Sequence, residues 1–163
     1  MPFNEDSRVK IPALVHLTRL GYTFLPKSEM INIHGDTNVF VDVFKKGISK
    51  INQKAYSDAE INGFIGELNT QLDNSDLGKV FYRSLTGEFA CKLIDFEDFD
   101  NNLFHVVTEL TCKNEEEEFR PDITVLINGM PLAFIEVKKP NNRDGILAER
   151  ERINRRFKNP KFK

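Results

Sequence analysis

The stretch from Arg120 to Lys139 decides the fold and reads RPDITVLINGMPLAFIEVKK. Two apolar runs of strand-like composition flank Asn128-Gly129, which is a strong signal for a two-residue hairpin turn. The stretch therefore predicts two antiparallel β-strands joined by a tight turn.

Charged residues stand at the open end of this predicted hairpin. Asp122 opens the first strand, and Glu136 and Lys138 lie near the end of the second strand. Side chains alternate between the two faces of a strand, so Glu136 and Lys138 point the same way and Val137 points to the other face. The return of the second strand brings its far end back to Asp122. We therefore expect two carboxylates and one ammonium group to converge at an edge of the sheet.

Such a trio can bind a divalent metal ion and activate a water molecule. Two carboxylates held close together repel each other unless a positive charge sits between them. Oxygen ligands suit Mg²⁺, which usually keeps several waters and takes one or two protein carboxylates. A bound metal lowers the pKa of its water and stabilises charge that develops on a phosphate. Lys138 would orient that water or neutralise the charge on the phosphate. The pattern thus favours hydrolysis of a phosphodiester.

A second interpretation treats the same charges as structural. In that case Glu136 and Lys138 pair with neighbouring side chains, and the chain is a non-catalytic DNA-binding or subunit-docking module. The residues from Leu132 to Val137 are almost wholly apolar apart from Glu136. A charge in so apolar a strand needs a partner or a function, and the sequence alone allows either.

The charged residues also form a motif. Pro121-Asp122, followed by thirteen residues and then Glu136-Val137-Lys138, resembles the PD-(D/E)xK nuclease motif. The wider sequence resembles the N-terminal endonuclease domain of the R subunit of type I restriction enzymes. This resemblance covers nearly the whole chain and is most specific over residues 119–159. The stretches that carry it are Asp6–Leu14, Leu20–Tyr22, Phe119–Asp122, Phe134–Asn141 and Ala148–Asn159.

The resemblance implies an α/β fold with a PD-(D/E)xK, or restriction endonuclease-like, core, in which helices flank a mixed central sheet. It implies a Mg²⁺-dependent endonuclease that cuts double-stranded DNA in a restriction-modification system, with Mn²⁺ able to replace Mg²⁺. Asp122 and Glu136 would bind the metal together with the carbonyl of Val137, and Lys138 would be the catalytic lysine. In such systems the R subunit works with methyltransferase and specificity subunits, and its motor domains bind ATP.

Two motifs of the resembled proteins are missing. Family members carry Gln-x-x-x-Tyr on or near the helix after the catalytic lysine, but residues 138–163 contain no such motif. We favour a position beyond residue 163 over its loss. The ATP-binding motif Gly-x-x-x-x-Gly-Lys-Ser/Thr is also missing, since the one Gly-Lys pair, Gly78-Lys79, is followed by Val80. We therefore expect residues 1–163 to form a single nuclease domain, an N-terminal fragment of a larger R subunit without its ATP-dependent motor domains.

The formal net charge of −2 hides an uneven distribution of charge. Residues 138–163 contain ten Lys or Arg and three Asp or Glu. Residues 1–137 contain thirteen Lys or Arg and twenty-two Asp or Glu. A basic segment directly after the predicted catalytic strand suits a phosphate backbone, although a solvated helix face would have the same composition. The candidate DNA contacts are Lys139, Arg150, Arg152, Arg155, Arg156 and Lys158.

The bulk composition sets the class of protein. A length of 163 residues and a hydrophobic content of 40% predict one domain with a substantial core. No run approaches the ~18 apolar residues of a membrane span, and the N-terminus lacks a signal-peptide pattern. Cys91 and Cys112 are far apart without metal-ligand spacing, so each is interpreted as a lone buried thiol. These features predict a protein of the reducing cytoplasm with no membrane partner.

Apolar periodicity and capping residues predict the remaining elements. Helices are expected over residues 6–20, 39–52, 57–72, 76–84 and 146–157. Ser57 and Glu60 form a capping box, and Pro12 predicts an irregular start for the first helix. Strands are expected over residues 22–25, 88–94 and 103–111, with an acidic loop over 114–118 and a turn over 141–145.

Overall fold

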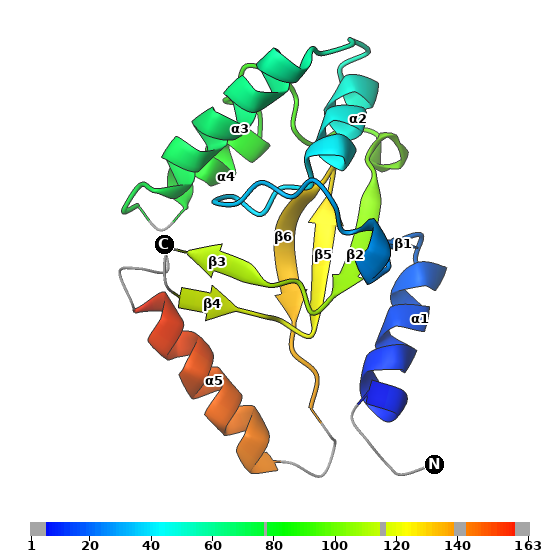
Figure 1. Cartoon of the computed structure of the whole chain (residues 1–163), viewed down its shortest axis with the longest axis vertical. Coiled ribbons are helices and arrows are strands. Elements are labelled where there is room, and N and C mark those ends of the chain that lie inside the picture. The colour runs from blue at the N-terminus through cyan, green and yellow to red at the C-terminus, as the bar shows by residue number, and fades with distance from the viewer. Residues whose placement is uncertain (1–5, 77, 115–116, 139–142, 159–163) are drawn as a thin grey trace.

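A mixed four-stranded sheet forms the centre of the molecule (Figure 1). The structure is a computed structural model that describes residues 6–76, 78–114, 117–138 and 143–158. The sheet has the order β1-β2-β5-β6, with β1 parallel to β2 and the other neighbours antiparallel. Its strands are β1 Thr23–Phe24, β2 Phe104–Thr108, β5 Ile123–Ile127 and β6 Met130–Ile135. A mixed sheet flanked by helices confirms the predicted α/β class.

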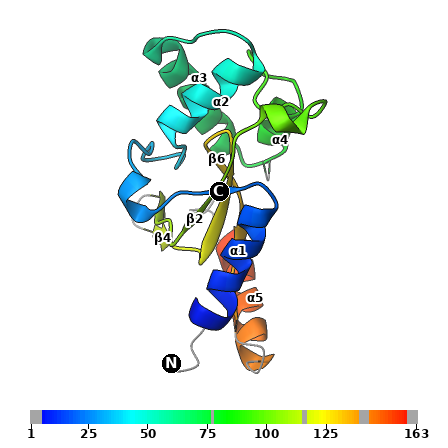
Figure 2. The same ribbon diagram turned by 90° about the vertical axis from the view of Figure 1, so that its right-hand side faces the viewer.

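The helices are placed differently at the two ends of the β5–β6 hairpin. α2, α3 and α4 lie beyond its turn end, whereas α1 and α5 lie beside its open end, on opposite sides in Figure 1; in Figure 2, seen from the α1 side, α1 lies in front of part of α5. The bounds are η1 Asp6–Lys10, α1 Ile11–Arg19, η2 Lys27–Glu29, α2 Val41–Ile51, α3 Asp58–Leu72, α4 Lys79–Leu85, η3 Phe99–Asn101 and α5 Arg143–Phe157. A second, two-stranded sheet consists of β3 Cys112–Asn114 and β4 Glu117–Phe119.

The inner strand β5 is buried on both faces, which explains its continuous apolar run. On one face Val106, Ile123 and Val137 pack against α1 and its flanking residues. On the other face Val107 and Leu126 pack with neighbouring loop residues. A further cluster joins α2, α3 and the segment after α4, and includes Phe44, Ile48, Ile61, Ile65, Leu68, Leu93 and Ile94.

The predicted helices are confirmed to within a few residues. At the start of α3 the Ser57 hydroxyl accepts a hydrogen bond from the Glu60 N–H, and the Glu60 carboxylate accepts one from the Ser57 N–H. The chain enters α1 through the π-helical turn η1, and Pro12 lies in the first turn of α1, where a missing N–H breaks no helical hydrogen bond. The first helix therefore has the irregular start that Pro12 predicted.

The predicted strand over residues 88–94 is wrong. Cys91 and Leu93 are buried there, but the described structure assigns the segment to no strand. The Asn52 side chain forms hydrogen bonds with the backbone of this segment that a neighbouring strand would otherwise form. Its amide donates to the Lys92 carbonyl at 2.8 Å, and its oxygen accepts a hydrogen bond from the Lys92 N–H at 2.9 Å. Apolar composition alone cannot distinguish a strand from a buried irregular segment whose backbone is satisfied by a side chain.

Two predicted connections also differ. The acidic loop over residues 114–118 is wrong in part, because Glu117 and Glu118 belong to β4, which pairs with β3. Residues 115–116 lie outside the described structure, as do residues 141 and 142 of the predicted turn. Residues 143–145 are helical, since α5 begins at Arg143.

Both cysteines are free thiols, with Cys91 buried and Cys112 half-buried. Burial raises the pKa of each thiol to about 11, so both stay protonated at neutral pH. In the part of the chain that the structure describes, no helix is long and apolar enough to cross a membrane.

The Asn128-Gly129 turn is buried and ties three segments together. Both residues have positive φ angles, 49° and 80°, as the predicted hairpin turn requires. The fully buried Asn128 side chain accepts a hydrogen bond from the Leu103 N–H at 2.8 Å and donates to the Leu93 carbonyl at 2.9 Å. It also donates to Asn102 Oδ1 at 2.9 Å. A Cβ atom at position 129 would come within 2.6 Å of a backbone nitrogen of α2, so only glycine fits there.

Replacing Asn128 with alanine should destabilise the whole domain. The change leaves a buried N–H and a buried carbonyl without partners, and each such loss costs about 1–3 kcal/mol. We expect Asn128→Ala to lower the free energy of unfolding by about 3 kcal/mol, measured by urea denaturation and far-UV circular dichroism. Asn32→Ala is the matched control, because Asn32 also has a positive φ, 51°, but is exposed. Equal losses in the two variants would contradict a special role for the buried turn.

Candidate active site

The β5–β6 pairing contains a β-bulge. Next to the turn Leu126 pairs with Pro131, whereas Val125 pairs with Ala133, so Leu132 is an extra residue in β6. Proline cannot donate a ladder hydrogen bond, and inside sheets it is found at such irregular points.

The bulge determines which residue lies opposite Asp122. Beyond it Ile123 pairs with Ile135, so the next pair outward is Asp122 with Glu136. Without the extra residue Asp122 would face Ile135, and Glu136 would move to the other face of the sheet. The structure thus brings the two predicted acids together at the open end of the hairpin.

Asp122 lies directly before β5. Its Oδ2 atom accepts a hydrogen bond from the Val137 N–H at 3.0 Å, and its Oδ1 atom lies 3.6 Å from Lys10 Nζ of η1. Burial acts to raise the pKa of Asp122. The Val137 N–H, a hydrogen bond with Glu136 and the nearby ammonium groups outweigh burial, so this pKa lies below its usual value. Asp122 is therefore the ionised member of the acid pair.

Glu136 lies directly after β6 and is more deeply buried, with 9% of its side chain exposed. Burial raises the pKa of Glu136, and so do its hydrogen bond with Asp122 and the negative charge of that residue. Two carboxylates so close to each other cannot both ionise easily unless a positive charge lies near them. Among the residues that the structure describes, its buried Oε1 atom finds no hydrogen-bond partner.

Two charged residues of α5 complete a closed ring with Glu136 and Lys138. Lys138 Nζ lies 3.8 Å from Glu136 Oε2 and 3.5 Å from Glu149 Oε2. Arg152 Nε donates to Glu149 Oε1 at 2.7 Å, and Arg152 Nη2 lies 3.6 Å from Glu136 Oε1. We call these four alternating charges, Glu136, Lys138, Glu149 and Arg152, the charge ring.

A second set of charges lies on the α1 side of the acids. Besides Asp122, Lys10 contacts Glu109, whose Oε1 atom is 3.2 Å from Lys10 Nζ, and Lys27 lies 3.6 Å from Glu109 Oε2. The hydrogen bond from Lys10 and its positive charge lower the pKa of Glu109. The Glu109 N–H donates to the Asp122 carbonyl at 3.2 Å. Cations from both sides of the sheet therefore compensate the acid pair.

The acid pair has the chemistry that a hard divalent cation requires. A cation would balance the two negative charges and would bind the buried Glu136 Oε1 atom, which makes no hydrogen bond within the described structure. Among the described residues no group of three or more His, Cys, Asp or Glu side chains gathers as a metal site. The side chains here thus offer two carboxylates, a number that suits Mg²⁺ with its retained waters. Val137, predicted as a carbonyl ligand, is held nearby by its buried side chain and by its N–H bond to Asp122.

The six predicted DNA contacts differ in their surroundings. Arg150, Arg152, Arg155 and Lys158 are exposed. Arg152 turns toward the acids of the charge ring, and the Arg156 guanidinium lies 4.4 Å from the centre of the Phe119 ring. Lys139 lies outside the described structure. Their contact with DNA stays a prediction.

Three residues of this arrangement were not predicted from the sequence: Lys10, Glu109 and Glu149. Lys10 and Glu109 are 99 residues apart in the sequence, so no local sequence pattern predicts their contact. Glu149 did carry a signal, because it stands three residues before Arg152 on a predicted helix, where opposite charges pair.

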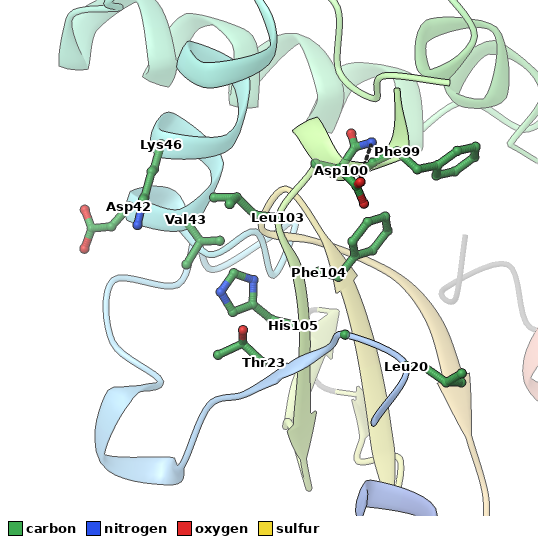
Figure 3. A pocket seen from close by; sticks show the side chains of 12 residues that line it. Leu20, Thr23, Asp42, Val43, Lys46, Phe99, Asp100, Leu103, Phe104 and His105 are labelled. Atoms are coloured by element: carbon green, nitrogen blue, oxygen red, sulfur yellow. Dashed lines mark hydrogen bonds between the residues drawn. The ribbon is translucent and has the colours of Figure 1, made fainter. Parts of the chain in front are cut away.

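A cleft of about 720 Å³ lies at the other end of the sheet (Figure 3). Lys46 of α2, His105 of β2 and Phe99 of η3 contribute to its lining. His105 lies beside Phe104, which pairs with Ile127 next to the turn, so the cleft is at the turn end of the hairpin and away from the acid pair. Burial and the charge of Lys46 lower the pKa of His105, which keeps the imidazole neutral at pH 7.

Comparisons with known proteins agree on one protein family. Residues 2–162 match the family described as type I restriction enzyme R protein N terminus. A protein of Methanocaldococcus jannaschii, provisionally named type I restriction enzyme MjaIXP endonuclease subunit, is 31% identical over an alignment of 163 residues. The type I restriction enzyme HindI endonuclease subunit of Haemophilus influenzae is 29% identical over 160 residues.

These alignments cover most of this chain but a small part of each relative. They include 85% and 83% of the chain, and only 16% and 15% of the two relatives. The match over nearly all residues agrees with the resemblance carried by the PD-(D/E)xK motif. The chain belongs to the family of N-terminal domains of type I restriction enzyme R proteins.

Proposed function

We propose that this chain is the endonuclease domain of a type I restriction enzyme R subunit and that it hydrolyses phosphodiester bonds of double-stranded DNA with Mg²⁺. Asp122, Glu136 and the carbonyl of Val137 would hold the ion, and Lys138 would be the catalytic lysine. Mn²⁺ would be able to replace Mg²⁺.

One observation carries the proposal. Asp122 and Glu136 lie opposite each other beyond the Ile123–Ile135 pair, and the charge of Asp122 is one cause that raises the pKa of Glu136; a carboxylate pair this close is costly unless a cation lies between its members. The Glu136 Oε1 atom is buried and, within the described structure, accepts no hydrogen bond. A buried polar atom without a hydrogen bond is uncommon in folded proteins and calls for an explanation, of which a bound ion is one. A divalent cation accounts for both features at once.

The roles of the residues follow from their positions. When bound, the cation supplies an activated water and stabilises negative charge on the phosphate. Asp122 and Glu136 would both act as ligands in their ionised form. The Val137 N–H would keep the Asp122 carboxylate in its orientation, because it already donates to Oδ2. The Lys138 ammonium, 3.8 Å from Glu136, would balance charge on the reacting phosphate.

The family supplies the setting of the reaction. The relatives are named as endonuclease subunits, and this chain aligns with only a small part of each. We propose that it works in a restriction-modification complex with methyltransferase and specificity subunits, in the cytoplasm where its DNA substrate lies. ATP would be bound by motor domains outside residues 1–163.

The alternative is a non-catalytic DNA-binding or subunit-docking module with a nuclease-like fold. One observation favours it: Lys10, Lys138 and Arg152 lie 3.6, 3.8 and 3.6 Å from the two acids and compensate them without a metal. Metal binding and cleavage separate the two functions.

Metal binding should depend on Asp122. We expect titration of Mn²⁺ into the chain to release or absorb heat in calorimetry, and Asp122→Ala to abolish that heat because one of two carboxylate ligands is gone. Asp36→Ala is the control, since Asp36 is an exposed aspartate of a turn. A folded wild-type chain that binds no Mn²⁺, or equal binding by Asp122→Ala, would contradict the metal site.

Cleavage should fail while DNA binding survives. In the full-length R subunit with its partner subunits and ATP, we expect Asp122→Ala and Lys138→Ala each to slow plasmid cleavage by at least about a hundredfold, because each removes electrostatic stabilisation of the reacting phosphate. Gel-shift assays in Ca²⁺ should show unchanged DNA binding. Lys79→Ala changes an exposed lysine of α4 and should cleave normally. Wild-type cleavage by Asp122→Ala would favour the docking module.

The exposed basic residues of the C-terminal region should contribute to DNA affinity. Arg155→Gln with Lys158→Gln removes two exposed charges. We expect the double variant to bind duplex DNA about tenfold more weakly near 0.1 M salt and to reduce the slope of log affinity against log salt by about 2. The matched control is Lys79→Gln with Arg83→Gln, two exposed charges of α4. An unchanged salt slope would show that residues 155 and 158 make no phosphate contact.

A further inference from the structure

The charge ring connects a proposed metal ligand to α5, which lies outside the PD-(D/E)xK motif. Its members differ in burial: the side chains of Glu136 and Glu149 are 9% and 12% exposed, whereas that of Arg152 is 49% exposed. A half-exposed guanidinium can swing into water, while the two carboxylates are fixed by their surroundings. The ring therefore contains two buried acids and one cation that is half-exposed to water.

Arg152 is positioned so that its positive charge would repel a metal ion bound at Glu136. Its Nη2 atom lies 3.6 Å from Glu136 Oε1, the buried oxygen that accepts no hydrogen bond from the described residues. A divalent cation on that oxygen would meet the guanidinium at short range, and like charges so close repel strongly. The hydrogen bond from Arg152 Nε to Glu149 at 2.7 Å gives the side chain a second anchor on its own helix. Arg152 can thus leave Glu136 without losing every partner.

Glu149 would favour metal binding, whereas Arg152 would oppose it. Its carboxylate adds negative charge beside the acid pair and is one of the causes that raise the pKa of Glu136. Its Oε2 atom lies 3.5 Å from Lys138 Nζ, closer than the 3.8 Å between Lys138 and Glu136. Glu149 therefore draws the ammonium group toward α5 and away from the oxygens that a metal needs.

We infer that Glu149 and Arg152 are positioning residues that set the metal affinity of the acid pair with opposite signs, an inference that rests on the proposed function. Glu149 holds Lys138 beside the site and favours the cation. Arg152 neutralises Glu136 in the absence of the cation and leaves it when the cation binds. α5 thereby controls how readily the site is filled.

Calorimetric titration of Mn²⁺ into variants of this chain tests the inference. Arg152→Gln removes the opposing charge and should lower the dissociation constant on the order of tenfold, whereas Glu149→Gln removes the favouring charge and should raise it on the order of tenfold. Arg152→Lys keeps the positive charge and should not bind more tightly than the wild type. Opposite signs are decisive, because loss of merely structural contacts would weaken binding in both glutamine variants.

Matched controls make the same charge changes outside the ring. Glu151→Gln alters an exposed acid of α5, and Arg83→Gln alters an exposed arginine of α4. Both should leave the Mn²⁺ affinity unchanged, and far-UV circular dichroism should show each variant folded.

Two kinds of failure can be told apart. If the wild type binds Mn²⁺ and Asp122→Ala does not, but the glutamine variants at residues 149 and 152 shift in one direction or not at all, the inference is wrong and the proposed function stands. If the wild type binds no Mn²⁺ at the acids, both are overturned.

Discussion

The candidate site depends on the pairing register of β5 and β6, which one extra residue in β6 shifts by a single position. A one-residue slip would place Asp122 and Glu136 on different faces of the sheet. The register is fixed from both ends of the hairpin. At the turn end Asn128 is locked by buried hydrogen bonds, and at the open end the Val137 N–H bonds to Asp122 while its side chain packs in the core. The acids are therefore positioned by a rigid pair of strands rather than by a loop.

Bringing two carboxylates into a half-buried position is costly, and the structure offsets that cost with cations from separate parts of the chain. Lys10 comes from η1, Lys138 follows β6 and Arg152 belongs to α5. α1 and α5 lie on opposite sides of the open end of the hairpin, so the compensation comes from both sides (Figures 1 and 2). The three cations lie 3.6, 3.8 and 3.6 Å from carboxylate oxygens of the pair. The fold thus accommodates the acid pair without a metal, although the buried Glu136 Oε1 atom makes no hydrogen bond within the described structure.

The sequence was sufficient wherever the deciding interactions are local. The Asn-Gly turn, the capping box at Ser57 and the spacing of Asp122 and Glu136 each involve residues that are close in the chain or joined by one hairpin. Prediction failed where a distant group decides. Residues 88–94 look like a strand, but the Asn52 side chain satisfies their backbone from 40 residues away. The contact of Arg152 with Glu136 was also not predicted, because composition carries no information about it, and the predicted contact of Arg152 with DNA stays a prediction.

The two ends of the β5–β6 hairpin differ in the hydrogen bonding of their buried polar side chains. At the turn end the Asn128 side chain makes hydrogen bonds through both its oxygen and its amide nitrogen. At the open end, within the part of the chain that the structure describes, Glu136 Oε1 is buried without any hydrogen bond. One hairpin contains both ends, so the difference does not reflect a general inability of this fold to satisfy polar groups. A buried polar group without a hydrogen bond at a motif position is explained by a ligand that completes it, because local rules are expected to fail at functional positions. Buried atoms of His105 and Thr124 also lack a hydrogen bond within the described structure, but among these three residues only Glu136 belongs to the nuclease motif and carries a charge that a cation would balance.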